Sequence, residues 1–144
     1  MSAAAAIVTA VGFCWLGMVA AISFLEAPLK FRAPGVTVPI GLGIGRLVFR
    51  ALNSIEIVFA ATILGAIIAD PPTTGTITAL AVAVAALIVQ LALVRPELTR
   101  RSDAVLAGHD APRSRGHYAY VVLETLKVAA LAVGAIMLLT NNVS

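Results

Sequence analysis

Long apolar stretches alternate with short polar segments along the whole chain. A helix that crosses a bilayer needs about 20 mostly apolar residues, and four stretches meet this need: residues 3–25, 47–69, 76–94 and 118–140. Prolines and a glycine in residues 70–75 predict a tight turn between the second and third stretches. The pattern therefore predicts an all-α fold, an integral membrane four-helix bundle, with residues 1–144 in one domain.

Composition agrees with a membrane protein. The chain is 60% hydrophobic and 12% charged, and its mean hydropathy is +1.02, well above the range of soluble domains. Cys14 is the only cysteine, so neither an intrachain disulfide nor a cysteine-based metal site is expected. The sequence contains no metal-binding, nucleotide-binding or nucleophile motif that would indicate an enzyme of a known class.

Basic residues predict the orientation. Nine of the ten Lys and Arg residues lie in or beside two connections, residues 26–46 and 95–117. The positive-inside rule makes these connections cytoplasmic, which places both termini outside (N-out and C-out) in a multi-pass protein of the cell (inner or cytoplasmic) membrane. Topology thus accounts for the pI near 9.6, and no nucleic-acid partner is expected. Membrane lipid is an expected partner, because basic loops attract anionic headgroups.

Five polar residues lie inside the predicted second and fourth helices. At 1.5 Å per residue, Glu56 and Lys127 lie about 13 Å from the cytoplasmic ends of their helices, and Asn53 and Glu124 about 9 Å. At 100° per residue, Glu124 and Lys127 share one face of their helix with Tyr120. Asn53 and Glu56 form a similar polar stripe on the second helix, and the stripes of the two helices should face each other or a shared cavity. These five residues, Asn53, Glu56, Tyr120, Glu124 and Lys127, are therefore the candidate ligand or ion site.

Burying these charges in lipid would be costly. Glu and Lys near a helix centre cost roughly 2.5 to 3.5 kcal/mol each on the insertion scale, against a gain of about 0.3 to 0.6 for each large apolar residue. The fourth helix is marginal alone, so its charges must face protein or water. Two interpretations stay open: a structural brace in which Lys127 pairs with Glu56 and Glu124, or a polar site open to the cytoplasm. An odd carboxylate could also carry a proton.

The connection at residues 26–46 is unusually apolar and rich in proline and glycine. It is expected to lie in the interface or to re-enter the membrane as the floor of the polar site. Five residues near the cytoplasmic helix ends form the predicted mouth of that site: Glu26, Lys30, Arg46, Arg50 and His117. Haem ligation by His117 is a minor alternative, and no cofactor is otherwise predicted.

Two stretches, "SFLEAPLKFRAP" and "GIGRLVFR", resemble a family of uncharacterised four-helix membrane proteins. That family includes transmembrane protein 205 and is distantly similar to the copper-resistance D superfamily. "RGHYAY" is similar to that family's histidine at the start of its last helix. The matching residues are Ser23, Phe24, Ala27, Pro28, Phe31, Arg32, Gly45, Arg46 and Phe49. The resemblance implies a four-helix membrane fold and brings no mechanism.

"RALNSIE" is similar to a second family, the membrane-associated glutathione and eicosanoid enzymes. That resemblance implies that Arg50, Asn53 and Glu56 help to bind glutathione. The expected function is non-enzymatic: binding or translocation of a small polar or ionic species by a small polytopic protein, in a homo-oligomer. An accessory or assembly subunit of a larger membrane complex, with the cluster as a brace, is the alternative. A glutathione-using membrane enzyme is the third.

Overall fold

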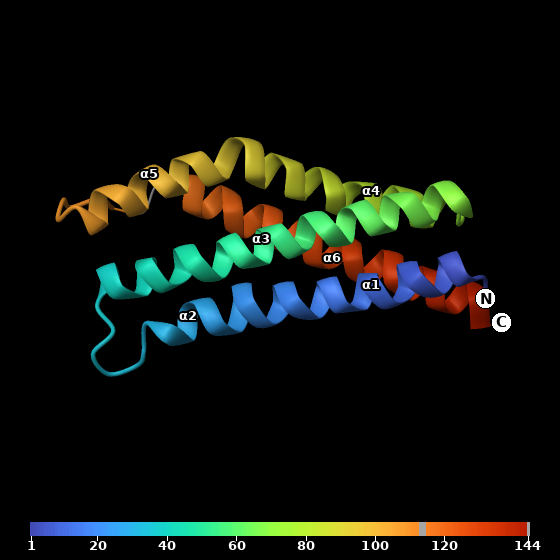
Figure 1. The fold of residues 1–144 in the computed structure, drawn as a ribbon, viewed down its shortest axis with the longest axis horizontal. Coiled ribbons are helices and arrows are strands. Elements are labelled where there is room, and N and C mark those ends of the chain that lie inside the picture. The colour runs from blue at the N-terminus through green and yellow to red at the C-terminus, as the bar shows by residue number, and fades with distance from the viewer. Residues whose placement is uncertain (113–114, 144) are drawn as a thin grey trace.

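Four helical rods make up the fold. The computed structural model describes residues 1–112 and 115–143, and its elements within these residues are all helical. The rods are Ala3–Lys30, Val38–Ala69, Thr74–Leu106 and Arg115–Val143, and each is long and apolar enough to cross a membrane. They run side by side, with both chain ends at the same end of the molecule (Figure 1). The prediction of four membrane-length helices is confirmed.

The first and third rods each pass through a proline. The first consists of α1 (Ala3–Val19), the π-helix η1 (Ala20–Glu26) and α2 (Ala27–Lys30), and the third of α4 (Thr74–Val89), the π-helix η2 (Gln90–Val94) and α5 (Arg95–Leu106). A proline ring clashes with the carbonyl four residues earlier. The wider π turns make bonds to the carbonyl five residues earlier instead, as from the Arg95 N–H to Gln90. Both rods therefore continue through Pro28 and Pro96.

The second rod, α3 (Val38–Ala69), begins nine residues before the predicted start at residue 47. Thr37 caps it by accepting a hydrogen bond from the Ile40 N–H at 3.3 Å, and Pro39 lies in its first turn, where proline is tolerated. Only residues 31–37 are non-helical between α2 and α3. The prediction of an irregular connection over residues 26–46 was therefore wrong for most of its length.

Glycines in the first turns of α3 make room for the preceding segment. A Cβ atom on Gly41 would lie 2.1 Å from a ring carbon of Phe31, and one on Gly45 would lie 3.1 Å from Lys30 Nζ. The GxxxG spacing of Gly41 and Gly45 therefore serves packing within the chain, where the side chains of Phe31 and Lys30 lie against α3.

The predicted polar connection at residues 95–117 is also largely helical. Its first part is α5, which continues the third rod and contacts α3 through an ion pair of 2.8 Å between Arg46 and Asp103. Residues 113 and 114 of this connection lie outside the described residues. The last rod, α6, begins at Arg115 and ends at Val143, so it extends the predicted span of residues 118–140 by three residues at either end.

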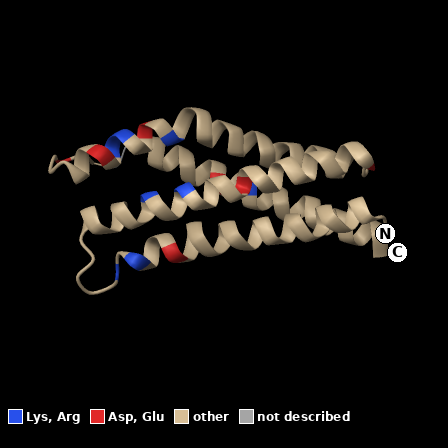
Figure 2. Cartoon of the chain, in the orientation of Figure 1, with Lys and Arg blue, Asp and Glu red and all other residues tan. Residues whose placement is uncertain are grey.

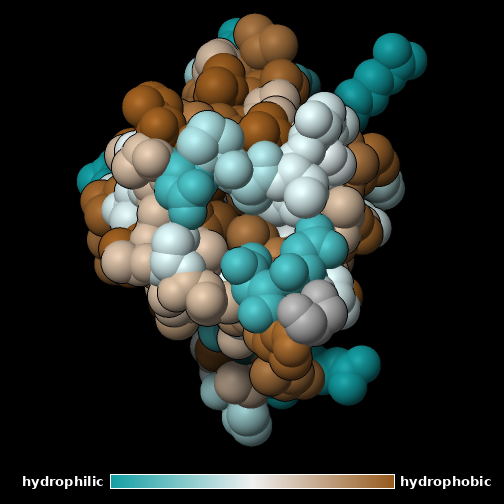
Figure 3. Space-filling model, turned by 90° about the vertical axis from the view of Figure 1, so that its right-hand side faces the viewer, coloured by the Kyte–Doolittle hydropathy of each residue, from teal (hydrophilic) through white to brown (hydrophobic). Residues whose placement is uncertain are grey.

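The interior and the sides of the bundle are both apolar. Trp15, Ile63 and Leu131 are fully buried, whereas Leu93 is 71% exposed and Ile68 81% exposed. Figure 3 views the end that carries the termini: hydrophilic residues cluster on that end and hydrophobic residues lie around its sides. An apolar outer surface fits helices that face lipid. Charged residues gather at the opposite end, apart from a group in the middle of the bundle (Figure 2).

Candidate functional site: a buried charge cluster and a basic cavity

A buried ion cluster centres on the Lys127 ammonium of α6. Its Nζ lies 2.5 Å from Glu56 Oε2 and 2.6 Å from Glu124 Oε1, and it donates a hydrogen bond of 2.9 Å to Gln90 Oε1. Lys127 and Glu56 are 0% exposed, and Glu124 and Gln90 are 1% exposed. All three ammonium protons thus have an acceptor, and these charges face protein rather than lipid.

The two carboxylates have further donors from the first and third rods. The Trp15 indole N–H donates to Glu56 at 2.8 Å, and the Ser23 hydroxyl donates to Glu124 at 2.6 Å. The Gln90 amide donates to Glu124 at 3.2 Å. The two π-helices matter here, because Ser23 lies in η1 and Gln90 in η2. Each rod therefore contributes at least one side chain to the cluster, which holds the four rods together near mid-length.

The first and second rods form one helical hairpin, and the third and fourth rods form another. The two cluster carboxylates occupy equivalent positions in these two hairpins. Glu124 follows Glu56 by 124 − 56 = 68 residues, and Pro96 follows Pro28 by 96 − 28 = 68 residues. The same offset joins pairs of buried residues: Val8 and Thr76, Val19 and Leu87, Ile63 and Leu131. The hairpins thus repeat one pattern of buried positions. Lys127 breaks this repeat, since the equivalent residue is Phe59, and its single ammonium serves both carboxylates.

A cavity of about 740 Å³ opens beside the cluster, towards the end opposite the termini. All four rods line it, through η1 and α2, α3, η2 and α5, and α6. Its charged lining is strongly basic, because Glu124 is the only acidic residue among the described residues that line it. The basic side chains are Lys30, Arg46, Arg50, Arg95 and Arg101.

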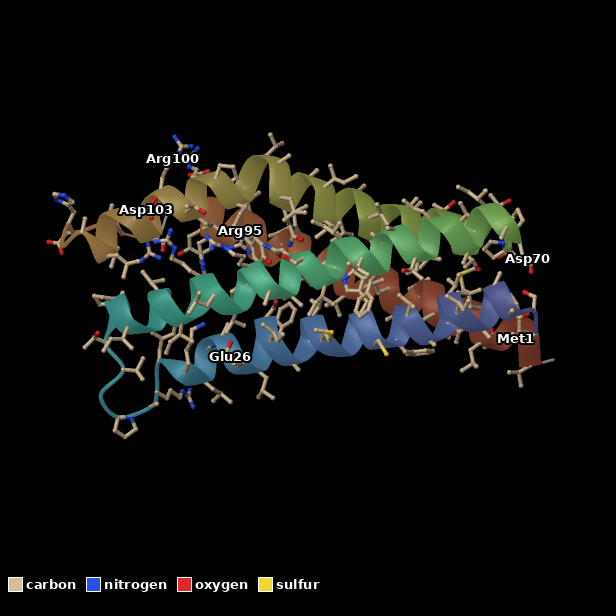
Figure 4. The ribbon with its side chains drawn as sticks, in the orientation of Figure 1. Met1, Glu26, Asp70, Arg95, Arg100 and Asp103 are labelled. Carbon is tan, nitrogen blue, oxygen red and sulfur yellow. The ribbon has the colours of Figure 1, made fainter. Side chains whose placement is uncertain are left out.

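Arg95 lies in the cavity wall against two aromatic rings. Its guanidinium carbon lies 4.9 Å from the centroid of the Tyr120 ring and 5.4 Å from that of Phe49. Figure 4 shows Arg95 pointing into the bundle, whereas Arg100 of the same helix points away from it. The buried Nε and Nη2 atoms of Arg95 and the buried Tyr120 hydroxyl complete no hydrogen bond of normal geometry with any described residue, and the hydroxyl lies near the Glu124 carboxylate. Buried donors are normally satisfied, so the two Arg95 atoms mark a place for an acceptor.

Most of the other cavity cations already have partners. Lys30 lies 3.7 Å from Glu26 in an ion pair, Arg46 pairs with Asp103, and the Arg101 Nε–H donates to the backbone carbonyl of Ala111 at 3.1 Å. Their positive charges still contribute to the potential in the cavity, but their geometry is set by these contacts. Arg95 differs because its donors are directed at the cavity without such a contact.

The structure divides the predicted site in two. Asn53, Tyr120 and Glu124 line the cavity, whereas Glu56 and Lys127 lie behind it in the buried cluster. Of the predicted mouth, the residues that line the cavity are Lys30, Arg46, Arg50 and His117. Glu26 contributes through its ion pair with Lys30 instead.

Several residues of the two sites escaped the sequence analysis. Gln90 is the one polar side chain in the second half of the predicted helix at residues 76–94, and Arg95 precedes Pro96 directly after that helix. Arg95 was used only as one of the basic residues that predict the orientation, and Gln90 belonged to no polar stripe. Trp15 carried no signal beyond being the single tryptophan, and Ser23 appeared only among the residues of the family resemblance.

The residues expected to bind glutathione or haem do not all lie in one place. Arg50 and Asn53 line the cavity, but the Glu56 carboxylate is bound by Trp15 and Lys127 behind it, so the three residues do not form one glutathione-binding wall. Within residues 1–112 and 115–143, no three His, Cys, Asp or Glu side chains come together as a metal site. His117 lines the cavity, with its ring 5.5 Å from that of Tyr118.

Comparisons with protein-family models, with curated proteins and with solved structures found no match to this chain.

Proposed function

We propose that this chain is an integral membrane protein that binds a small anionic species in its basic cavity. The observation that carries the proposal is the pair of buried Arg95 donors, Nε and Nη2, which lack an acceptor and lie beside Tyr120 in the wall of a cavity with predominantly basic charges. Arginine is well suited to this role, because its guanidinium is always charged and binds carboxylate or phosphate with two parallel N–H bonds. The adjoining cluster is the brace that supports the cavity.

The proposed topology places the cavity in the cytoplasmic half of a cell membrane. Both termini lie at one end of the bundle and the basic residues gather at the other (Figure 2), and the positive-inside rule assigns the basic end to the cytoplasm. Single cysteines in a Cys14→Ala background test this orientation. Ser2→Cys should react with an impermeant maleimide in intact cells, and Ala107→Cys only after permeabilisation. The reverse labelling pattern would refute the orientation.

The charge balance of the cavity favours an anion over a cation. Five Lys and Arg side chains line it against Glu124 alone. That carboxylate shares the Lys127 ammonium with Glu56, so the cluster has an excess of one negative charge against the five cations of the wall. The walls of a concave, low-dielectric site focus such a potential and raise the local concentration of a ligand of opposite charge. A cation would face net repulsion there.

Binding fits the interior better than passage through a single chain. Beyond the cluster, towards the termini, the described core consists of apolar side chains, Ala60, Ile63, Leu80, Ala83, Leu131, Ala135 and Leu138, and of Thr76, whose hydroxyl is already bonded to Thr73. An ion crossing this part of the bundle would lose its hydration without gaining polar partners, which is costly. The cavity therefore ends at the buried cluster, and translocation would require a second chain or a large rearrangement.

Equilibrium binding of phosphate to the protein purified in a neutral detergent tests the proposal. Arg95→Gln should weaken binding by about tenfold to a hundredfold, because a hydrogen bond to a charged group contributes roughly 1.5 to 3 kcal/mol. Arg100→Gln is the matched control: it removes the same charge from the same helix, on the exposed side. Equal losses in the two variants would mean that only bulk charge matters. No saturable binding of phosphate or of an alkyl phosphate would refute an anion site.

A further inference from the structure

We infer that the occupant of the cavity is an amphipathic anion: a phosphate head bound at Arg95 and Tyr120, with an apolar chain that leaves the cavity along the lipid-facing side of the bundle. This inference depends on the proposed anion site and names the class of its ligand. Three features of the cavity support it: its size, its opening and its depth.

The cavity is large and mostly apolar for an inorganic ion. Its volume of about 740 Å³ lies within the range of roughly 300 to 1,000 Å³ that holds drug-sized organic ligands. Beside the basic groups, its walls carry Phe31, Leu42, Phe49 and Leu91. A free phosphate bound at Arg95 would leave these apolar walls in contact with water, whereas an attached hydrocarbon chain would cover them.

Several apolar residues of the cavity wall also belong to the outer surface. Phe24 in η1 is 45% exposed and Ile57 in α3 is 52% exposed, and both line the cavity. The apolar lining is thus continuous with the apolar sides of the bundle, which face lipid in the proposed topology. A chain that followed Phe24 or Ile57 out of the cavity would enter the bilayer rather than water.

The depth of the basic groups matches the level of lipid headgroups. Arg95 lies 21 residues from Thr74 at the start of α4, and Arg50 lies 19 residues from Ala69 at the end of α3. At 1.5 Å per residue these separations are about 32 Å and 29 Å, close to the thickness of about 30 Å of the hydrocarbon core. The anionic head of a lipid in the basic-end leaflet would therefore lie level with both guanidinium groups without leaving the bilayer.

The donor set favours a phosphate monoester as the head. Its terminal oxygens accept several hydrogen bonds at once and carry up to two charges. Two oxygens can accept hydrogen bonds from Arg95 Nε and Nη2, and a third can accept from the Tyr120 hydroxyl. These three protein donors complete no hydrogen bond of normal geometry with a described residue. Arg50 and Asn53, on the α3 wall of the same cavity, add charge and an amide. A zwitterionic head would bring a cation into the same basic surroundings, which is unfavourable.

Lipid retention provides the test. The full chain is reconstituted in phosphatidylcholine vesicles that contain a minority of phosphatidic acid and extracted with a neutral maltoside detergent, and the bound lipids are identified by native mass spectrometry. Wild-type protein should retain phosphatidic acid at least about tenfold above its share of the vesicle lipid, and Arg95→Gln should lose that enrichment. Arg100→Gln should keep it.

The head and the chain are then separated by a second variant and a second probe. Ile57→Ser makes the exit from the cavity polar, so it should lower retention of phosphatidic acid and leave binding of inorganic phosphate within about twofold of wild type. Inorganic phosphate that binds through Arg95 without any enrichment of phosphatidic acid would overturn the amphipathic ligand and leave the anion site standing. Failure of both probes would overturn the inference and the proposed function together.

Discussion

Replacing Lys127 by methionine should be among the most destabilising single changes in this protein. The ammonium is fully buried, and it lies within 2.6 Å of a carboxylate oxygen on both Glu56 and Glu124. Methionine keeps most of the side-chain volume, so the change removes the charge more than the packing. Two buried carboxylates would then lack a cation, and breaking a buried ion pair on one side costs about 3 to 5 kcal/mol of unfolding free energy.

The cluster predicts an asymmetry between its members. Glu56→Gln leaves Lys127 with Glu124 at 2.6 Å and with Gln90 at 2.9 Å, so the cation stays paired. Its cost should be that of charge-assisted hydrogen bonds, about 1.5 to 3 kcal/mol. The double variant should be more stable than Lys127→Met alone, because it no longer buries the Glu56 charge without a partner. The coupling free energy of this double-mutant cycle should therefore be favourable in the wild type.

Reversible unfolding in mixed detergent micelles, followed by circular dichroism, measures these changes. Lys30→Met is the matched control, because the Lys30–Glu26 ion pair is longer, at 3.7 Å, and its side chains are 10% and 37% exposed. Because Glu26 keeps its contact with solvent, the cost of Lys30→Met should lie between the roughly 0 to 1 kcal/mol of exposed pairs and the cost of breaking a buried pair. If Lys127→Met costs no more than Lys30→Met, or if Glu56→Gln costs as much as Lys127→Met, the buried cluster is not the brace inferred from its geometry.

Two further pairs of variants test the cluster and the entry to α3 by the same unfolding measurement. Ser23→Ala removes a bond of 2.6 Å to the Glu124 carboxylate and should cost about 1.5 to 3 kcal/mol. Ser54→Ala removes only a bond within its own helix, and equal costs would contradict this ranking. Gly43→Ala meets no atom within 4 Å and should stabilise the helix by about 0.5 to 1 kcal/mol. Gly41→Ala places Cβ 2.1 Å from an aromatic ring and should be about 1 to 3 kcal/mol less stable than Gly43→Ala; equal stability would mean that the ring moves freely.

Hydropathy and helical periodicity predicted the four rods and the shared polar face of Glu124 and Lys127. These signals are strong because a membrane-length apolar run has few alternatives. The helix ends were harder to predict. The first helix was predicted to end at residue 25, before Pro28, yet a π-helix carries the first rod past this proline to Lys30. Whether a proline ends a helix or is accommodated depends on the wider turn before it, and local composition does not show that turn.

The division of the polar residues into a cluster and a cavity was not predictable from one helix at a time. A stripe shows that several polar residues share a face, but not which of them lie deeper between neighbouring helices. Gln90 and Trp15 illustrate the limit, because each is flanked by apolar residues on both sides and belongs to no predicted polar stripe. Their roles follow from the packing of four rods, which brings both to within hydrogen-bond distance of the cluster.

Glu124 connects the two sites. Its Oε1 lies against Lys127 and its Oε2 accepts from Ser23, while the same residue lines the cavity. A carboxylate fixed in this way is a rigid floor, since any rotation would break bonds to the first, third and fourth rods. For a bound anion the floor is also an electrostatic stop: deeper movement would bring the ligand towards Glu124 and away from Arg95. In the proposed anion site, the brace and the basic wall together would therefore hold the ligand at the level of Arg95, as a binding site does and a channel does not.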